Sequence, residues 1–385
     1  MKILLVGSLN TIFIYSYADY FLGKGYDVFI LNTSTIVDIN STRYDGTNLY
    51  KMQLSCTTKY GTIKKIISTF KLDTINVFWW FYSLLFERKS LSQDKYLQVE
   101  ELLLNNSFDL AFCFWGTSLR KEILALKTVI KSRKLNLKIV LSVSTYPVRY
   151  NVPKKKNLSW YFLKKDKAYF ELCDGLILSG ELMKSVIVDY LGFTGDYILF
   201  KDFLPTKYFA ENIAESRSDL IFLGNVRFNE RTIDNVTQQL IDIADNGIRV
   251  WIQEPCNVKH PNINTFKPFT LQEISSGKLG GFLNNFKASV VLYNKVDNLR
   301  MGTTFPTRFA LATLGRHDIF IPKGVFDTLE GLNENVSTYN DIPDLVNRYT
   351  SSESFIDDIE YFSLDGQTNS NIFDSFIKRI LANNQ

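Results

Sequence analysis

Residues 301–315, MGTTFPTRFALATLG, combine hydroxyl groups, an arginine and the start and stop signals of a helix. Thr304 is predicted to cap this helix, Pro306 falls in its first turn, where a missing N–H is harmless, and a final glycine ends it. The free N–H groups of a helix start bind anions, and Thr303, Thr304 and Arg308 would add hydroxyl and guanidinium contacts. We predict a pyrophosphate site here; the alternative is a capped helix without a ligand.

A second phosphate-type pattern is DLIFLGNVRFNERTIDNV, which begins at residue 219. An apolar strand ends at Gly224, and Arg227 and Arg231 follow before a predicted helix. A glycine lets a ligand approach the backbone, and two arginines can fork around phosphate oxygens. The alternative is a pair of solvated surface arginines.

The loop of residues 265–269, TFKPF, follows a short predicted strand. Its backbone could meet the edge of a nucleobase, with aromatic rings beside it. We therefore name Phe266, Lys267 and Phe269 as candidate base-binding residues, and a surface turn is the alternative.

Ligands of open parallel sheets bind beyond the carboxyl ends of the strands, so the loops after the strands of the amino-terminal half are candidate acceptor contacts. None of these loops holds a specific motif. The first has one glycine rather than the three spaced glycines of a dinucleotide site, so nicotinamide or flavin binding is unsupported. The candidate acceptor-side residues are Gly7, Asn10, Trp115, Thr145 and Arg149.

Lysines alternate with aromatic residues in two parts of the amino-terminal half. Such a mixture suits a membrane surface, because rings sit at headgroup level while cations meet anionic lipid. A buried aromatic helix with a charged outer face is the alternative. Nucleic acid is disfavoured as a partner, because the sequence holds no nucleic-acid-binding signature. The candidate membrane-surface residues are Trp79, Trp80, Lys154, Lys155, Lys156, Trp160, Lys164 and Lys165.

The composition excludes several kinds of site. The chain has two histidines, His260 and His317, and four widely separated cysteines, which argues against a metal site of His and Cys ligands and against a Ser-His-Asp or Cys-His triad. No catalytic residue can be named, and no metal or cofactor is expected. The free cysteines and the lack of a signal peptide favour a cytoplasmic protein.

Charge is unevenly distributed along the chain. Residues 1–205 hold 27 Lys and Arg against 18 Asp and Glu, whereas the remainder holds 17 against 22. A basic amino-terminal half suggests an anionic partner, such as a membrane surface or a phosphorylated acceptor, although chance is an alternative. The longest apolar run, residues 75–86, is too short to cross a bilayer.

The apolar periodicity predicts an α/β fold. Residues 2–6 form a strand, residues 12–24 a helix and residues 27–31 a second strand, which is a right-handed βαβ unit with parallel strands. Further strands of the first half are predicted at residues 110–114, 139–143 and 175–178. Those of the second half are predicted at residues 219–223, 248–252, 288–292 and 318–321.

Two doubly wound Rossmann-like domains in tandem follow from this series, with a cleft expected between them. We place the first domain at residues 1–202 and the second, which holds the phosphate-type patterns, at residues 203–353. Residues 354–385 are predicted to form closing helices that cross back to the first domain.

Together these segments resemble glycosyltransferases of the GT-B fold, most closely the large retaining family four. KILLVGSLN with GKGYDVFIL resembles that family's first strand, glycine loop and second strand. ELCDGLILSGELMKSVI and YILFKDFLPTKYF resemble the strand before the domain crossover and the interdomain segment. DLIFLGNVRFNER resembles the start of the donor domain, and FLNNFKASVVLYN with FPTRFALATLGRHDIFIP resembles its later nucleotide-binding part.

The resemblance spans residues 1–322, and each motif is degenerate, so its specificity comes from order and spacing. One departure concerns the donor ribose: the family's ribose-binding glutamate falls on Ala310, and the predicted helix holds no carboxylate.

The resemblance implies transfer of a sugar from a UDP- or GDP-linked donor to a glycan or lipid-linked acceptor in cell-surface polysaccharide synthesis, without a bound metal. A scaffold protein of this fold without turnover, or a nucleotide-sugar epimerase, are the alternatives. The stereochemical outcome is left open.

Overall fold

The computed structural model describes residues 1–33, 48–50, 77, 93–148, 151–224, 236–293, 298–352 and 359–382. The chain divides into two compact units. Unit 1 comprises Met1–Lys201, Asn298–Thr303 and Ile372–Gln385, and unit 2 comprises Asp202–Asp297 and Thr304–Asn371. The predicted boundary at residue 202 lies next to the observed one, but residues 298–303 belong to unit 1 although they were predicted within the second domain.

Unit 1 contains a seven-stranded sheet whose described pairings are all parallel. The strand order is β3-β2-β1-β4-β5-β6-β7, so the direction of winding reverses between β1 and β4. The strands are β1 (Lys2–Gly7), β2 (Asp27–Asn32), β3 (Asn48–Tyr50), β4 (Leu110–Phe114), β5 (Lys138–Val143), β6 (Gly175–Leu178) and β7 (Asp196–Leu199).

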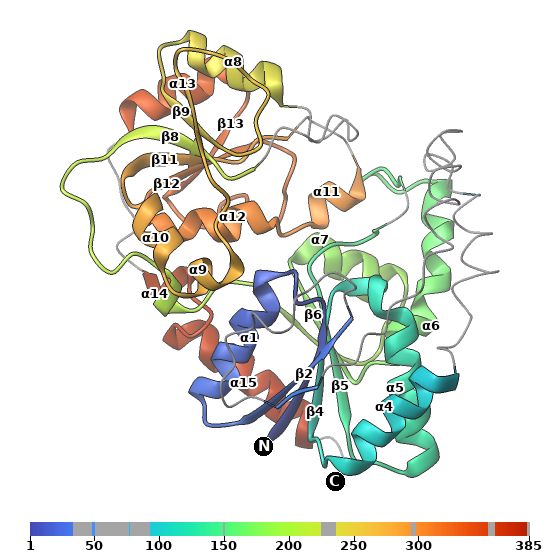
Figure 1. The fold of residues 1–385 in the computed structure, drawn as a ribbon. Helices are drawn as coiled ribbons and strands as arrows, with labels where there is room; N and C mark the ends of the chain where they lie inside the picture. The colour runs from blue at the N-terminus through green and yellow to red at the C-terminus, as the bar shows by residue number, and fades with distance from the viewer. Residues whose placement is uncertain are drawn as a thin grey trace. The chain divides into compact units, whose positions relative to one another are not determined.

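Helices cover both faces of this sheet, because alternate side chains of each strand point to opposite sides. On one face, Leu4 and Cys113 pack into a core that includes residues of α4 and α5. On the other face, the ring of Phe112 lies 4.7 Å from Tyr17 of α1 and 5.8 Å from Phe373 of α15. Figure 1 shows α15, in red, beside the blue α1. The helical segments of unit 1 are α1 (Ile12–Gly23), α4 (Gln93–Asn105), η4 (Gly116–Leu119), α5 (Arg120–Arg133), η5 (Leu158–Asp166), α6 (Lys167–Phe170), α7 (Glu181–Lys184), η6 (Ser185–Tyr190), α11 (Leu299–Thr303) and the carboxyl-terminal part of α15 (Gln367–Ala382).

Unit 2 contains a six-stranded sheet, also with parallel pairings. Its order is β10-β9-β8-β11-β12-β13, so winding reverses between β8 and β11. The strands are β8 (Ser218–Phe222), β9 (Val250–Gln253), β10 (Ile263–Phe266), β11 (Phe286–Val290), β12 (Asp318–Pro322) and β13 (Val336–Tyr339).

The second sheet is also covered on both faces, with α8 and α13 on one side and α9, α10 and α12 on the other (Figure 1). Leu240 of α8 and Leu345 of α13 pack into the core that contains Phe222 and Val290. The helical segments are η7 (Thr206–Tyr208), α8 (Thr237–Asp245), α9 (Leu271–Ser275), α10 (Lys278–Leu283), α12 (Thr307–Ala312), η9 (Thr313–Gly315), α13 (Ile342–Ser351) and α14 (Ile359–Phe362).

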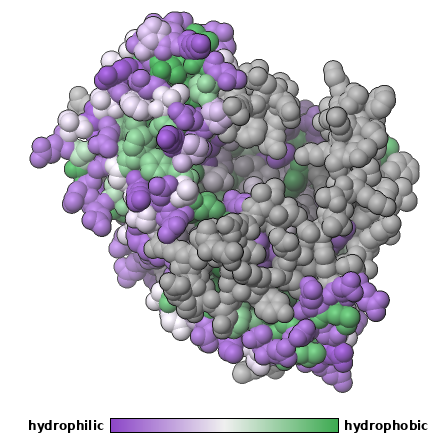
Figure 2. Space-filling model, in the orientation of Figure 1, coloured by the Kyte–Doolittle hydropathy of each residue, from purple (hydrophilic) through white to green (hydrophobic). Residues whose placement is uncertain are grey.

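Both units therefore confirm the predicted fold class of two Rossmann-like doubly wound domains. On the face drawn in Figure 2, hydrophilic residues make up most of the coloured surface, and hydrophobic residues form smaller areas between them. Within the described ranges, each helix is too short or too polar to cross a bilayer.

Candidate active site

The winding reversal of unit 2 lies between β8 and β11, and the carboxyl ends of two such strands form the usual ligand crevice of a doubly wound sheet. β8 ends at Phe222 and leads to Gly224, and β11 leads to Leu292 and Tyr293. The outer parts of both loops, including the predicted diphosphate contacts Arg227 and Arg231, lie outside the described residues.

Arg308 of α12 reaches these two strand ends. The centre of its guanidinium lies 5.1 Å from the centroid of the Phe222 ring and 4.7 Å from that of Tyr293. Its Nη1 also lies 3.5 Å from the carbonyl oxygen of Leu292, at the outer limit of a hydrogen bond. Two aromatic faces therefore restrict the guanidinium, which stays partly exposed.

Gly224 makes room for this arrangement. A Cβ atom built on Gly224 would lie 2.9 Å from Nε of Arg308 and 2.7 Å from Cζ of Phe222, closer than real Cβ contacts. The φ angle of Gly224 is not in the left-handed region, so the reason for glycine here is space rather than backbone conformation. The structure thus brings together Gly224 and Arg308, which the sequence presented as parts of two separate patterns.

A guanidinium held between two rings suits recognition of phosphate oxygens, because its planar fork donates two parallel hydrogen bonds. Holding the fork in place beforehand reduces the conformational entropy that a ligand would have to remove. The arrangement can therefore bind an anionic group at the ligand edge of the second sheet.

The helix that contains Arg308, α12, begins later in the chain than we predicted. Thr304 and Phe305 are not helical, and α12 starts at Thr307 with Pro306 in the N-cap position and no side-chain cap. The prediction of Thr304 as the cap was wrong because a proline disfavours the helical conformation in the residue before it, here Phe305. A short, uncapped helix contributes less to anion binding than we predicted. The positive charge of the candidate site therefore comes mainly from Arg308.

Thr303 ends α11 in unit 1, and its side chain is fully buried. The hydroxyl donates to the carbonyl oxygen of Tyr146, and the Thr303 carbonyl accepts a 2.5 Å hydrogen bond from Ser179. The predicted role of this hydroxyl in an anion site is therefore not supported. Ala310, the predicted counterpart of the ribose-binding glutamate, is also fully buried.

Solved structures of three glycosyltransferases are similar to almost the whole chain. The lipopolysaccharide outer core galactosyltransferase WaaB has a TM-score of 0.51 and 11% identity, covering 98% of this chain and 100% of its own. The catalytic domain of Arabidopsis thaliana starch synthase IV, bound to ADP and acarbose, has a TM-score of 0.53 and 7% identity, covering 99% of both chains. A mutant of Staphylococcus aureus TarM, in complex with fondaparinux, α-GlcNAc-glycerol and UDP, has a TM-score of 0.51 and 10% identity, covering 99% of this chain and 98% of its own.

The chain has the GT-B fold. The sequence by itself matches no family model and no curated protein. The predicted resemblance is thus confirmed at the level of the fold, and assignment to family four stays a prediction.

In this GT-B chain, the predicted base-binding loop follows β10 at the edge of the second sheet. Phe266 is buried, and its ring packs against Phe282 at 5.2 Å and Phe269 at 6.4 Å. Lys267 is exposed, and Phe269 is half-buried. Phe266 is therefore a core residue, while Lys267 and Phe269 stay predicted base contacts.

His317 belongs to the interior of unit 2. It is fully buried, its Nε2 lies 2.6 Å from the hydroxyl of Ser289, and its Nδ1 lies 3.1 Å from the carbonyl of Leu283. Burial and the charge of Arg217 lower the pKa of His317 to about 3. The histidine is therefore neutral near pH 7, and both ring nitrogens are used in hydrogen bonds inside the domain.

The loops predicted to contact an acceptor follow the strand ends of the sheet of unit 1. Gly7 lies against the next strand, since a Cβ there would be 3.0 Å from the carbonyl oxygen of Phe114. Asn10 and Trp115 are exposed, whereas Thr145 is buried. Arg149 lies outside the described residues.

A buried polar network supports these loops, and sequence reasoning missed it. Arg120 pairs with Asp166 at 2.5 Å, and the Tyr146 hydroxyl donates to the same carboxylate at 2.9 Å. The Tyr169 hydroxyl donates to the carbonyl of Gly116 at 2.7 Å. Burial raises the pKa of Tyr169 well above its usual value, which keeps the proton that this bond needs. Tyr146 could have been selected from the sequence because it follows a predicted strand. Its pairing with Asp166 could not, because no local sequence pattern relates the two residues.

The predicted membrane-surface residues divide between surface and core. Trp160 is buried, donates from its indole nitrogen to the carbonyl of Pro153 at 3.0 Å and packs edge-on against Tyr190, so its predicted membrane contact was wrong. Leu158 and Tyr161, which are not among the candidate membrane-surface residues named from the sequence, are 92% and 61% exposed. Lys155, Lys156 and Lys164 are exposed, Lys154 and Lys165 are half-buried, and Trp79 and Trp80 lie outside the described residues.

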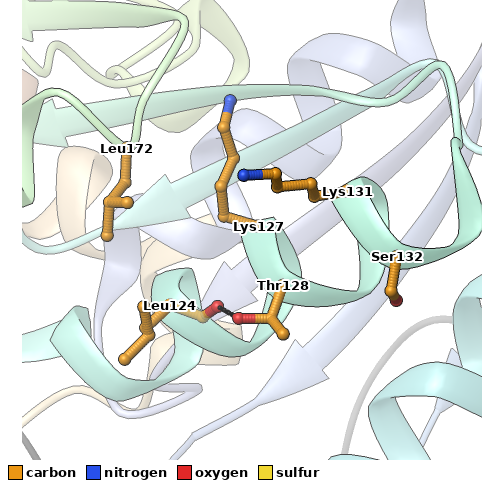
Figure 3. Close-up of a pocket in the computed structure, with 6 residues that line it drawn as sticks. All are labelled: Leu124, Lys127, Thr128, Lys131, Ser132 and Leu172. Atoms are coloured by element: carbon orange, nitrogen blue, oxygen red, sulfur yellow. Dashed lines mark hydrogen bonds between the residues drawn. The ribbon is translucent and has the colours of Figure 1, made fainter.

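A surface hollow of about 540 Å³ lies on the outer side of α5, away from the strand ends. Figure 3 shows its lining residues, five from α5 and Leu172 from the segment before β6. Lys127 lies 3.4 Å from Asp174, which is a partner within unit 1. The hollow therefore contributes nothing to the candidate active site.

Proposed function

We propose that this protein is a glycosyltransferase that moves a sugar from a nucleotide-diphosphate sugar, UDP- or GDP-linked, to a hydroxyl of a glycan or lipid-linked saccharide. Its proposed role is in the synthesis of cell-surface polysaccharide. The observation that carries the proposal is Arg308, held between Phe222 and Tyr293 beside Gly224 at the winding reversal of the second GT-B domain. Similarity in fold to structures with bound UDP and ADP adds support.

In the proposed reaction, the bond between the anomeric carbon and the β-phosphate oxygen breaks, the acceptor oxygen forms the new glycosidic bond, and its hydroxyl proton passes to an oxygen of the departing diphosphate. Negative charge grows on the departing diphosphate. The Arg308 guanidinium would stabilise that charge, in the role that a divalent cation has in other transferases. The arginine is already positioned by the two rings, so little reorganisation is needed as the charge develops.

The test is nucleotide binding by the full chain. Titration calorimetry with UDP, GDP and ADP should show binding of at least one, and Arg308→Ala should weaken it by about 1 to 3 kcal/mol. Arg308→Lys, which keeps the charge but loses the fork, should recover only part of the affinity. Arg348→Ala is the matched control, because this exposed arginine pairs with Asp344 on α13.

Two outcomes separate the alternatives. If none of the three diphosphates binds, the scaffold alternative replaces the enzyme. If a nucleotide-sugar is converted to its epimer without an added acceptor, the epimerase alternative is correct. If Arg308→Ala binds diphosphates as tightly as wild type does, Arg308 is not part of the diphosphate-binding site.

The proposed acceptor domain also carries the candidate membrane surface, now defined as Leu158, Tyr161, Lys155, Lys156 and Lys164. Leu158 and Tyr161 project from η5, and the Lys164 ammonium lies 5.6 Å from the centre of the Tyr161 ring. Apolar side chains among exposed lysines match an anionic bilayer surface, where the former enter the headgroup region and the latter meet lipid phosphates. We propose peripheral contact with the inner face of the cell membrane.

Sedimentation with vesicles of phosphatidylglycerol and phosphatidylcholine tests this contact. Leu158→Ser with Tyr161→Ser should reduce binding at all salt concentrations, and neutralising Lys155, Lys156 and Lys164 should remove its salt-sensitive part. Leu104→Ser, an exposed leucine of α4, is the control. Binding equal to wild type by both surface variants would refute the proposal.

A further inference from the structure

Trp115 is an exposed tryptophan at the ligand edge of the first sheet. Its side chain is 47% exposed, although large apolar side chains are normally withdrawn from water. The other large apolar residues of comparable exposure in the described ranges lie within helical segments, whereas Trp115 lies in the loop that leaves the end of β4. Its exposure at a strand end therefore needs its own explanation.

The position of Trp115 is the winding reversal of unit 1. Val6 of β1 pairs with Cys113 of β4, so the loops that follow these strands leave the sheet side by side. Gly7 keeps them close, because a Cβ there would lie 3.2 Å from Cβ of Phe114. One loop presents the exposed Asn10 and the other presents Trp115.

The backbone beneath the Trp115 ring is anchored on both sides. The Trp115 carbonyl accepts a 2.5 Å hydrogen bond from the Ser118 hydroxyl, and the Gly116 carbonyl accepts the buried hydrogen bond from Tyr169. Gly116 has a φ of 48°, a left-handed conformation that suits glycine. Hydrogen bonds thus hold the loop backbone in place while the ring is exposed, which is the property of a preorganised contact residue.

We infer that Trp115 is the platform on which a pyranose ring of the acceptor stacks, with Asn10 beside it as a hydrogen-bonding partner. A sugar ring has a face of C–H groups that packs on an indole, and its hydroxyls need both donors and acceptors, which an amide side chain supplies. The inference rests on the proposed function, and it names the substrate class: an acceptor saccharide with an accessible apolar ring face.

The test uses an array of immobilised oligosaccharides ending in glucose, galactose or N-acetylglucosamine, probed with the full-length protein in saturating UDP. Wild type should bind a subset, and Trp115→Ala should bind each member at least about tenfold more weakly, whereas Trp115→Phe should lose less. Leu104→Ala, similarly exposed on α4, should bind like wild type. Because the Trp115 ring is exposed, the variants should fold, which thermal unfolding checks.

Equal glycan binding by wild type and Trp115→Ala would overturn the inference, as would binding of no saccharide by wild type or an equal loss in Leu104→Ala. Calorimetry with UDP and GDP separates this result from the proposed function, since Trp115 lies in unit 1 and Arg308 in unit 2. If Trp115→Ala loses glycan binding but wild type binds no nucleotide, the proposed transferase activity is wrong and the saccharide-binding role of Trp115 still holds.

Discussion

The buried His317 makes a quantitative prediction about stability and pH. A carbonyl can only accept, so Nδ1 carries the proton that is donated to Leu283, and Nε2 accepts from the Ser289 hydroxyl. Protonating Nε2 would place a charge in the interior, which burial disfavours most and the nearby charge of Arg217 disfavours further, so the pKa of His317 falls to about 3. The neutral form is thus favoured by the fold.

The sign and size of the effect follow from this pKa. In the unfolded chain the pKa of a histidine is about 6.5, so the lowered folded value contributes stability that is fully present above that pH and is lost as the pH falls toward 3. At about pH 4.5 the loss amounts to roughly 2 to 3 kcal/mol. The loss should affect β11 and β12, which His317 joins through Ser289.

The assay compares wild type with His317→Gln, a neutral variant of similar size. Urea unfolding followed by amide exchange of peptides from β11 and β12 gives the stability of this region near pH 7.5 and pH 4.5. The variant should be less stable at the higher pH, since it loses buried packing and hydrogen bonds, but its stability should fall less on acidification. Other titrating groups are shared, so their contributions cancel in the difference. Equal pH dependence of the two proteins would refute the reasoning.

Two further predictions concern packing. Gly280→Ala should lower the unfolding free energy by about 1 to 3 kcal/mol, because its Cβ would lie 2.5 Å from the carbonyl oxygen of Tyr208, whereas Gly281→Ala on the same helix meets open space and should be neutral or stabilising. Thermal unfolding of the pair measures this, and equal midpoints would contradict it. Thr303→Val should remove the hydrogen bond from Oγ1 to the Tyr146 carbonyl, cost about 1 to 3 kcal/mol and speed amide exchange of α11; exchange rates like those of wild type would count against this role of the hydroxyl.

The central strands could be predicted from the sequence because both faces of a buried parallel strand are apolar. The segments of β1, β4 and β6 therefore appear as short continuous hydrophobic runs. β7 is half-buried throughout and β13 only partly buried, so their sequences lack that signal, and both were missed.

The candidate site was predicted in parts. Gly224 and Arg308 were each selected from local patterns, but their contact depends on the strand order that makes β8 and β11 neighbours, which no local pattern contains. Trp160 shows a second limit: the alternation of lysines and aromatics marks an amphipathic segment without saying which ring faces inward. Trp160 is buried and packs against Tyr190, whereas Tyr161, its neighbour in sequence, is exposed.

The two units consist of segments that alternate along the chain, which affects what truncation and recombination would do to each unit. Unit 1 is assembled from three stretches of sequence, the last of which supplies Phe376 and Ile380 to fill the space over Gly175. A premature stop codon after residue 371 would thus remove the part of α15 that packs on the amino-terminal sheet, whereas every residue of unit 2 would remain. A single recombination point after residue 201 would transfer unit 2 whole, but it would build unit 1 from both parents.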